Sequence, residues 1–142
     1  MKRFDKLLED DISGYEGKFS DLIREAPAFF RLMTRLLDDP LLPEKLSQLV
    51  IAAMAYFIKP LDIIPEENLG PQGYVDDIFL CAFVAEKVMV EAASEDILIN
   101  NWDGKRSVIP LIKEILKSEK ELIGDNKVNI MDFIGYEELA SA

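Results

Sequence analysis

The chain contains no histidine, and this absence removes several classes of active site at once. Its 142 residues include 27 acidic and 16 basic residues but no imidazole. Serine–histidine and cysteine–histidine catalysis, histidine-ligated zinc and proton transfer by histidine are therefore excluded. The sequence also lacks the GxxxxGK[ST] and GxGxxG motifs, so it has no phosphate-binding loop of the usual types. The carboxylates are the main groups left for chemistry.

Cysteine and long apolar runs are also scarce. Cys81 is the single cysteine, so no disulfide forms within the chain, and we expect a reducing compartment, the cytoplasm. The first residues lack the apolar region of a signal peptide. The apolar run 49–58 is about half the length that spans a bilayer, and the run 78–90 contains a Glu and a Lys. We therefore expect a soluble protein without membrane insertion.

Positive charge is sparse in the later part of the chain. The net charge is −11 at pH 7; up to Ser47 there are 8 basic and 10 acidic residues, and from Gln48 onward 8 basic and 17 acidic residues. A surface of this charge repels nucleic-acid phosphates and anionic lipid headgroups. We therefore expect no nucleic-acid partner, whereas a basic protein or a divalent cation fits the charge.

Apolar residues recur at helical spacing along nearly the whole chain. No segment alternates convincingly with a period of two, and no repeat or linker interrupts the pattern. We predict an all-α fold, one compact domain over residues 1–142 with about six or seven helices. The clearest stripes are Phe4, Leu7, Leu8 and Ile12; Phe29, Leu32, Met33, Leu36 and Leu37; Leu46, Leu49, Val50, Ala53 and Phe57; and Val108, Leu111, Ile112, Ile115 and Leu116.

Other segments carry weaker or less regular signals. Residues 78–85 are apolar on almost every side, which is typical of a central helix. Ser94 is expected to begin a short helix, and residues 129–139 are expected to form a terminal one. Trp102 is either an exposed anchor for a partner or a ring that closes over the core. The pair Phe29–Phe30 is either a contact patch or packs between neighbouring helices.

The stretch KPLDIIPEENLGPQGYVDD, residues 59–77, interrupts the helical pattern. It holds three prolines, two glycines and five carboxylates, and it predicts a stiff loop inside a central helical hairpin. Asp76 and Asp77 fall in the first turn of the second helix, where unpaired N–H groups and the positive end of the helix dipole favour carboxylates. Asp62 stands between two prolines, where its side chain can bond the following amides and fix the turn.

Three functions stay open for this stretch. In the first, the carboxylates are caps, and the chain is a non-enzymatic interaction or regulatory domain that binds an unknown protein partner through its acidic later half and loop residues such as Glu67 and Asn68. In the second, Asp62, Asp76 and Asp77 bind Mg²⁺ or Ca²⁺. Adjacent helical residues point about 100° apart, so only one of the two neighbouring aspartates could easily face inward.

The third and weaker alternative is a carboxylate-based hydrolase, for which no second catalytic group is evident. We therefore predict no catalytic residue and no cofactor apart from the cation of the second interpretation. The oligomeric state stays open.

A specific pattern lies between residues 36 and 86. An apolar helix ends in Tyr-x-x-x-Pro-x-Asp-x-x-Pro, and after a short connection Gly-Tyr-x-Asp-Asp leads into another apolar helix. With this pattern the chain resembles the YkvA-like domain family, whose function is not established. Glu66 stands where the family usually has Asp, and the connection ENLGPQ is one residue longer than the commonest one. The signature residues are Tyr56, Pro60, Asp62, Pro65, Gly73, Tyr74, Asp76 and Asp77.

Overall fold

The structure is a computed structural model, and it describes residues 4–58, 74–124 and 130–132. In these ranges every regular element is helical, which confirms the all-α prediction. The longer helices are α1 (Phe4–Ile12), α3 (Ala26–Asp38), α4 (Ser47–Ile58), α6 (Tyr74–Ala92) and α8 (Val108–Lys117). The short elements are α2 (Ser20–Ile23), the 3-10 helix η1 (Glu44–Leu46), α7 (Asp96–Ile99) and α9 (Glu119–Leu122).

The described ranges hold eight α-helices, where the sequence predicts about six or seven for the chain. Three of them, α2, α7 and α9, have only four residues each, which is too short for a periodic signal. At α7 the Ser94 hydroxyl accepts the backbone N–H of Asp96 at 3.2 Å, close to the predicted start, but the helix begins at Asp96 and its N-cap is Glu95. Of the predicted terminal helix 129–139, residues 130–132 are helical and the rest lies outside the described ranges.

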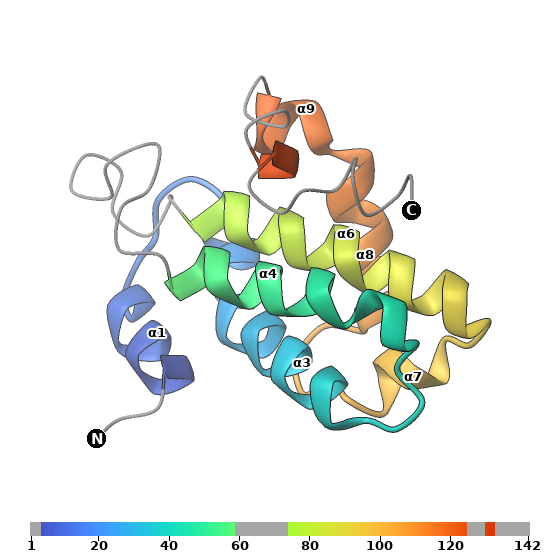
Figure 1. Cartoon of the computed structure of the whole chain (residues 1–142). Helices are drawn as coiled ribbons and strands as arrows, with labels where there is room; N and C mark the ends of the chain where they lie inside the picture. The colour runs from blue at the N-terminus through green and yellow to red at the C-terminus, as the bar shows by residue number, and fades with distance from the viewer. Residues whose placement is uncertain (1–3, 59–73, 125–129, 133–142) are drawn as a thin grey trace.

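Helix α6 is the centre of the fold (Figure 1), and it packs against α2, α3, α4, α7, α8 and α9. Seven of the eight residues from Ile78 to Ala85 are buried, and Phe83 is half-buried. A helix that is apolar on nearly every side needs neighbours on nearly every side, and α6 has them. The prediction of a central helix in this segment is confirmed.

Helices α3, α4 and α6 pack against one another and form the middle of the core. Most of the predicted stripes face this core, and each large apolar side chain that is fully buried there stabilises the fold by about 1.5–3 kcal/mol. Leu7 differs, because 48% of it is exposed although it belongs to a predicted stripe. The buried residues of α3 and α4 include Phe29, Leu32, Met33, Leu36, Leu49, Val50, Ala53 and Phe57.

A chain of aromatic rings connects four of the helices. The ring centroids of Phe4 and Phe30 are 4.8 Å apart, those of Phe30 and Phe57 5.8 Å, and those of Phe57 and Tyr74 6.3 Å. Separations of this size are those of edge-to-face and tilted aromatic pairs. Phe30 therefore packs between helices α1 and α4.

The neighbouring ring, Phe29, packs in another direction. Its centroid is 4.9 Å from that of Trp102, whose indole N–H donates to the carbonyl of Arg106 at 2.7 Å. These contacts favour the packing interpretation of both Phe29–Phe30 and Trp102. Among the described residues, no helix combines the length and the apolar character that a membrane crossing requires.

Candidate functional site

The sequence signature lies where α4 ends and α6 begins. Tyr56 is in the last turn of α4 and Tyr74 is the first residue of α6; they are 4% and 8% exposed. The ring centroids of Phe57 and Tyr74 are 6.3 Å apart, so the end of α4 lies beside the start of α6. Four of the other signature residues lie in 59–73, outside the described ranges, as do Glu66, Glu67 and Asn68. These signature residues are Pro60, Asp62, Pro65 and Gly73.

Asp76 and Asp77 stand side by side in the first turn of α6 but differ in burial. Asp77 is 2% exposed, whereas Asp76 is half-buried. This difference follows from the angle of about 100° between successive side chains of a helix. Both carboxylates lie at the positive end of the helix dipole, which favours their negative charge.

Cys81 lies one turn beyond Asp77 on the same helix and is fully buried. Burial raises the pKa of the Cys81 thiol well above its ordinary value, and the nearby negative charge of Asp77 raises it further. The free thiol is therefore protonated at neutral pH, and its burial keeps it away from solvent.

The described part of the chain does not assemble a metal site. Within residues 4–58, 74–124 and 130–132, no three His, Cys, Asp or Glu side chains lie together in a way that could hold an ion. The predicted ligand set also includes Asp62, which is outside these ranges. The cation site of Asp62, Asp76 and Asp77 therefore stays a prediction.

Helix α1, which lies before the signature in the sequence, contacts the signature directly. The hydroxyl of Tyr74 donates a hydrogen bond to the carboxylate of Asp11 at 2.7 Å. Asp11 is 63 residues away in the sequence, and nothing in its local pattern indicates this contact. The start of α6 and the end of α1 are thus held together by a charge-assisted hydrogen bond.

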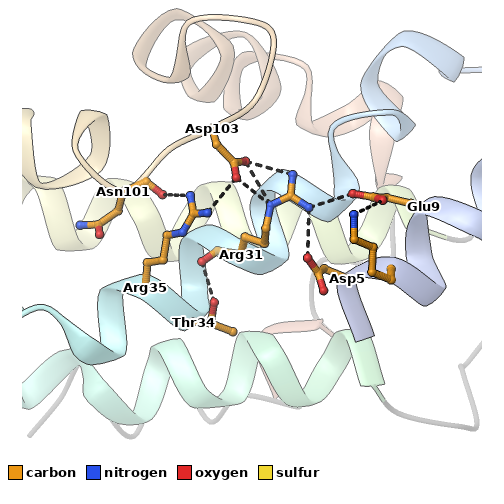
Figure 2. Close-up of polar contacts among 8 residues, drawn as sticks. Asp5, Glu9, Arg31, Thr34, Arg35, Asn101 and Asp103 are labelled. Carbon is orange, nitrogen blue, oxygen red and sulfur yellow. Dashed lines mark hydrogen bonds and ion pairs between the residues drawn. The ribbon is translucent and has the colours of Figure 1, made fainter. Parts of the chain in front are cut away.

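Arg31 on α3 joins three separate parts of the fold (Figure 2). One terminal nitrogen lies 3.3 Å from Asp5 and 3.1 Å from Glu9, both on α1. The Nε atom and the other terminal nitrogen bond both carboxylate oxygens of Asp103, at 2.9–3.1 Å. The guanidinium thus fixes α1 and the loop between α7 and α8 onto the same side of α3.

Arg35 extends this cluster by one helical turn. It lies 2.9 Å from Asp103 and donates to the carbonyl of Asn101 at 3.4 Å (Figure 2). Partial burial opposes ionisation of Asp103, but the hydrogen bonds and charges of Arg31 and Arg35 outweigh it, so the pKa of this carboxyl is lowered. The sequence places Arg31 and Arg35 on the polar face of their helix. It does not indicate that both bind Asp103.

The loop between α7 and α8 is also fixed from its other side, by Glu25. This carboxylate is 5% exposed and accepts the backbone N–H groups of Lys105 and Arg106. Burial raises the pKa of Glu25 despite these bonds. Gly104 lies between Glu25 and the ring of Trp102, and a Cβ atom at this position would overlap both. The charged groups around this loop therefore serve the fold.

The outward side of α4 differs from all these clusters because it is apolar and exposed. The helix contains no charged residue. Ile51 is 52% exposed and Ile58 51% exposed, and Ala55 between them is exposed as well. These positions fall on one side of a helix, whose other sides face α3 and α6 (Figure 1). We call Ile51, Ala55 and Ile58 the α4 stripe.

The sequence contains a signal for this stripe, although the pattern does not say which side is exposed. Residues 49–58 are all apolar. A helix that buries only one side needs fewer apolar residues than this. In the fold, only α3, α6 and η1 make substantial contacts with α4 among the described elements. The described elements therefore leave one side of this helix, which is apolar all round, without a neighbour.

The chain is similar to two curated proteins. The chain is 29% identical over 130 residues to "Uncharacterized protein ORF9" of Methanothermobacter thermautotrophicus. The aligned region covers 92% of this chain and 88% of that protein. It is 31% identical over 86 residues to "E3 ubiquitin-protein ligase RNF170" of Danio rerio, which covers 52% of this chain and 32% of that protein. No solved structure matches the chain.

A family model described as "Protein of unknown function (DUF1232)" matches residues 49–83, from the first buried turn of α4 to the middle of α6. The matched range contains the whole signature from Tyr56 to Asp77. It also contains the α4 stripe. Residues 49–83 are therefore a segment of the DUF1232 type, which confirms the resemblance to the YkvA-like domains of unknown function.

Proposed function

We propose that this chain is a non-enzymatic interaction domain that binds a protein through the α4 stripe. The observation that carries the proposal is the exposure of Ile51 and Ile58, about half of each side chain, on a helix without charge. Single exposed apolar residues are ordinary, but these follow one another at helical spacing on one side. Helix faces that dock onto partners present their anchors with this spacing.

The state of the reactive groups supports a role without catalysis. In the described part of the chain, Cys81 is buried and protonated, Arg31 and Arg35 are bound to carboxylates, and Asp77 is buried in the first turn of α6. Each of these groups contributes to packing or to the joining of helices. A catalytic group, in contrast, must reach a substrate.

The comparisons support a domain that works beside other parts. The similar protein of Danio rerio is by its name an E3 ubiquitin-protein ligase, and the similarity covers 32% of its length. The protein of Methanothermobacter thermautotrophicus is similar over 88% of its length. Similarity that spans most of one protein and about a third of another fits a module that works beside other parts. The single buried cysteine supports a cytoplasmic location.

Site-specific photo-crosslinking in cells that express this protein tests the proposed binding function. A photoreactive amino acid is placed at Ala55 in one variant and, as a control, at Leu41, which is 72% exposed between α3 and η1. We expect discrete protein adducts from position 55 and only weak, diffuse ones from position 41. Equal adduct patterns at the two positions, or none at position 55, would contradict the proposal.

A further inference from the structure

We propose that α1 is a strap that opens separately from the rest of the fold. It detaches from α3 as one unit while the other long helices stay folded, and it then uncovers aromatic side chains at the signature end of the molecule. The attachment of α1, its connection to α2 and the groups that it covers all favour such an opening. The opening does not involve the α4 stripe, so it is independent of the proposed binding function.

Helix α1 lies at one side of the fold (Figure 1) and has one main neighbour. Among the described elements it makes substantial contacts only with α3, whereas α6 has neighbours on nearly every side. The apolar part of the attachment is small: Leu8 and Ile12 are buried, and the ring centroid of Phe4 lies 4.8 Å from that of Phe30. Segments with few buried apolar contacts are the ones that open locally, without global unfolding.

The ionic part of the attachment can break without leaving a buried charge. One terminal nitrogen of Arg31 lies 3.3 Å from Asp5 and 3.1 Å from Glu9, both on α1 (Figure 2). The other two nitrogens bond Asp103 instead. When α1 leaves, the guanidinium therefore keeps Asp103, and the loop between α7 and α8 stays in place. Water hydrates the freed nitrogen and the carboxylates of α1, so the cost of an unpaired buried charge does not arise.

The connection between α1 and α2 has the properties of a hinge. Residues 13–19 join the two helices, and both glycines of this connection, Gly14 and Gly17, are exposed. Gly14 has a φ of 80°, in the left-handed region that glycine adopts without strain. Rotation about such exposed glycines moves α1 without moving the buried side chains of α2 and α3.

The length of α1 makes the opening cooperative. The helix has nine residues, and isolated helices shorter than about 12–15 residues are marginal in water. Helix α1 is therefore stable only where it is docked. Detachment and unwinding occur together, and all the amides of the helix lose their protection in the same event.

Opening uncovers groups that belong to the signature end of the fold. Phe30 is only 7% exposed in the closed state, and its ring centroid lies 5.8 Å from that of Phe57. The Tyr74 hydroxyl, which donates to Asp11 at 2.7 Å, is released to donate to water or to another acceptor. Phe57 and Tyr74 both lie in the range that matches the family model. The position of α1 therefore controls access to one edge of the family segment.

Native-state hydrogen exchange of the full chain, followed by mass spectrometry at low urea concentrations, tests the opening. We expect the amides of residues 8–12 to exchange at least about 100-fold faster than those in the middle of α6, with little dependence on urea, because a local opening exposes little surface. In the same samples the buried thiol of Cys81 reports the opening of α6. Its reaction with a thiol reagent should follow the slow α6 amides.

Two variants test the attachment through Arg31. Glu9→Gln should speed the exchange of α1 about two- to fivefold, because Arg31 loses a charged partner there, and it should leave the middle of α6 unchanged. Lys6→Met is the matched control. It removes only the pair between Lys6 and Glu9 within α1, and it should change the exchange of this helix by less than about twofold.

The strap would be overturned if residues 8–12 exchanged at the rate of the α6 amides and with the urea dependence of global unfolding. In that case α1 would open only together with the whole fold. Labelling of Cys81 as fast as α1 opens would overturn the proposal as well. So would an equal acceleration of α1 by Glu9→Gln and Lys6→Met, because the contact with Arg31 would then not hold the strap.

Discussion

The hydroxyl of Tyr74 lies 2.7 Å from a carboxylate oxygen of Asp11 and donates a hydrogen bond to it. Tyr74 belongs to the family signature, and Asp11 belongs to a helix outside the matched range 49–83. The ring of Tyr74 also lies 6.3 Å from that of Phe57. One signature residue therefore holds three helices together, α1, α4 and α6, which gives it a structural role independent of any ligand.

Removing this hydroxyl should destabilise the protein modestly. We expect Tyr74→Phe to lower the free energy of unfolding by about 1 kcal/mol, because a hydrogen bond to a charged but partly exposed carboxylate is lost. Asp11→Asn should have a similar or smaller effect. Urea unfolding of both single variants and the double variant gives the coupling energy. Strictly additive effects would show that the two groups do not interact in solution.

Arg31 should contribute more to stability than an exposed arginine. We expect Arg31→Met to lower the free energy of unfolding by about 2 kcal/mol, since its side chain is only 22% exposed and Asp5 beside it is buried. Arg24→Met is the matched control, because the Arg24–Asp21 pair is exposed and should change stability by less than about 0.5 kcal/mol. Equal losses in the two variants would contradict the role of the Arg31 cluster.

Asp103 and Glu25, the two carboxyl groups with shifted pKa values beside the loop between α7 and α8, should make the stability of the protein depend on pH with opposite signs. The pKa of Asp103 is lowered in the fold, so its stabilising effect is present above the unfolded pKa of about 3.9 and is lost as the pH falls through the folded pKa. The stability difference between wild type and Asp103→Asn should therefore shrink between about pH 5 and pH 3.

The pKa of Glu25 is raised by burial, so the folded state binds a proton more readily than the unfolded state. Relative to Glu25→Gln, the wild type should therefore lose stability as the pH rises from about 4 to 7. Denaturant unfolding from about pH 3 to pH 7 covers both titrations and measures both stability differences. The same sign for the two variants would contradict the assignment of these shifts.

Gly104 should not tolerate a side chain. We expect Gly104→Ala to lower the free energy of unfolding by about 1–3 kcal/mol, because the added methyl group overlaps the Trp102 ring and the Glu25 carboxylate. Gly17→Ala is the comparison, since its added methyl group meets the outer end of the half-buried Tyr15 ring, which can turn away if it gives up its hydrogen bond to the Lys18 carbonyl. Thermal unfolding of the two variants compares them directly, and a Gly104→Ala protein as stable as the Gly17→Ala protein would show that the loop packs differently.

Local spacing explains why much of the helical structure could be predicted. The stripes at 4–12, 26–38 and 108–117 become α1, α3 and α8, because a helix that buries one side must repeat its apolar residues at the helical period. The contacts of Arg31 with Asp103 and of Tyr74 with Asp11 could not be predicted. These contacts join residues that are 72 and 63 positions apart in the sequence. Which residues meet depends on how the helices pack.

The candidate site could be predicted only in part, for a related reason. The spacing of prolines, glycines and aspartates identifies the signature, and the angle between neighbouring residues of a helix explains why Asp77 is buried and Asp76 less so. The α4 stripe could not be found in this way. A helix that is apolar all round has no periodic sign of the side that stays exposed. Among the described elements, the positions of α3, α6 and η1 determine it.

The central claim about the signature is that its carboxylates stabilise the fold and do not bind a cation. Thermal unfolding of EDTA-treated protein with Mg²⁺, Ca²⁺ or Mn²⁺ tests it most directly, with Asp62→Asn, Asp76→Asn and Asp77→Asn alongside. We predict that the wild-type midpoint does not respond to any cation and that Asp77→Asn unfolds at a lower temperature without metal. A cation at about 100 times its Kd would add about 2.7 kcal/mol, a shift of several degrees. Such a shift in the wild type, absent from the variants, would contradict the account and establish a metal site.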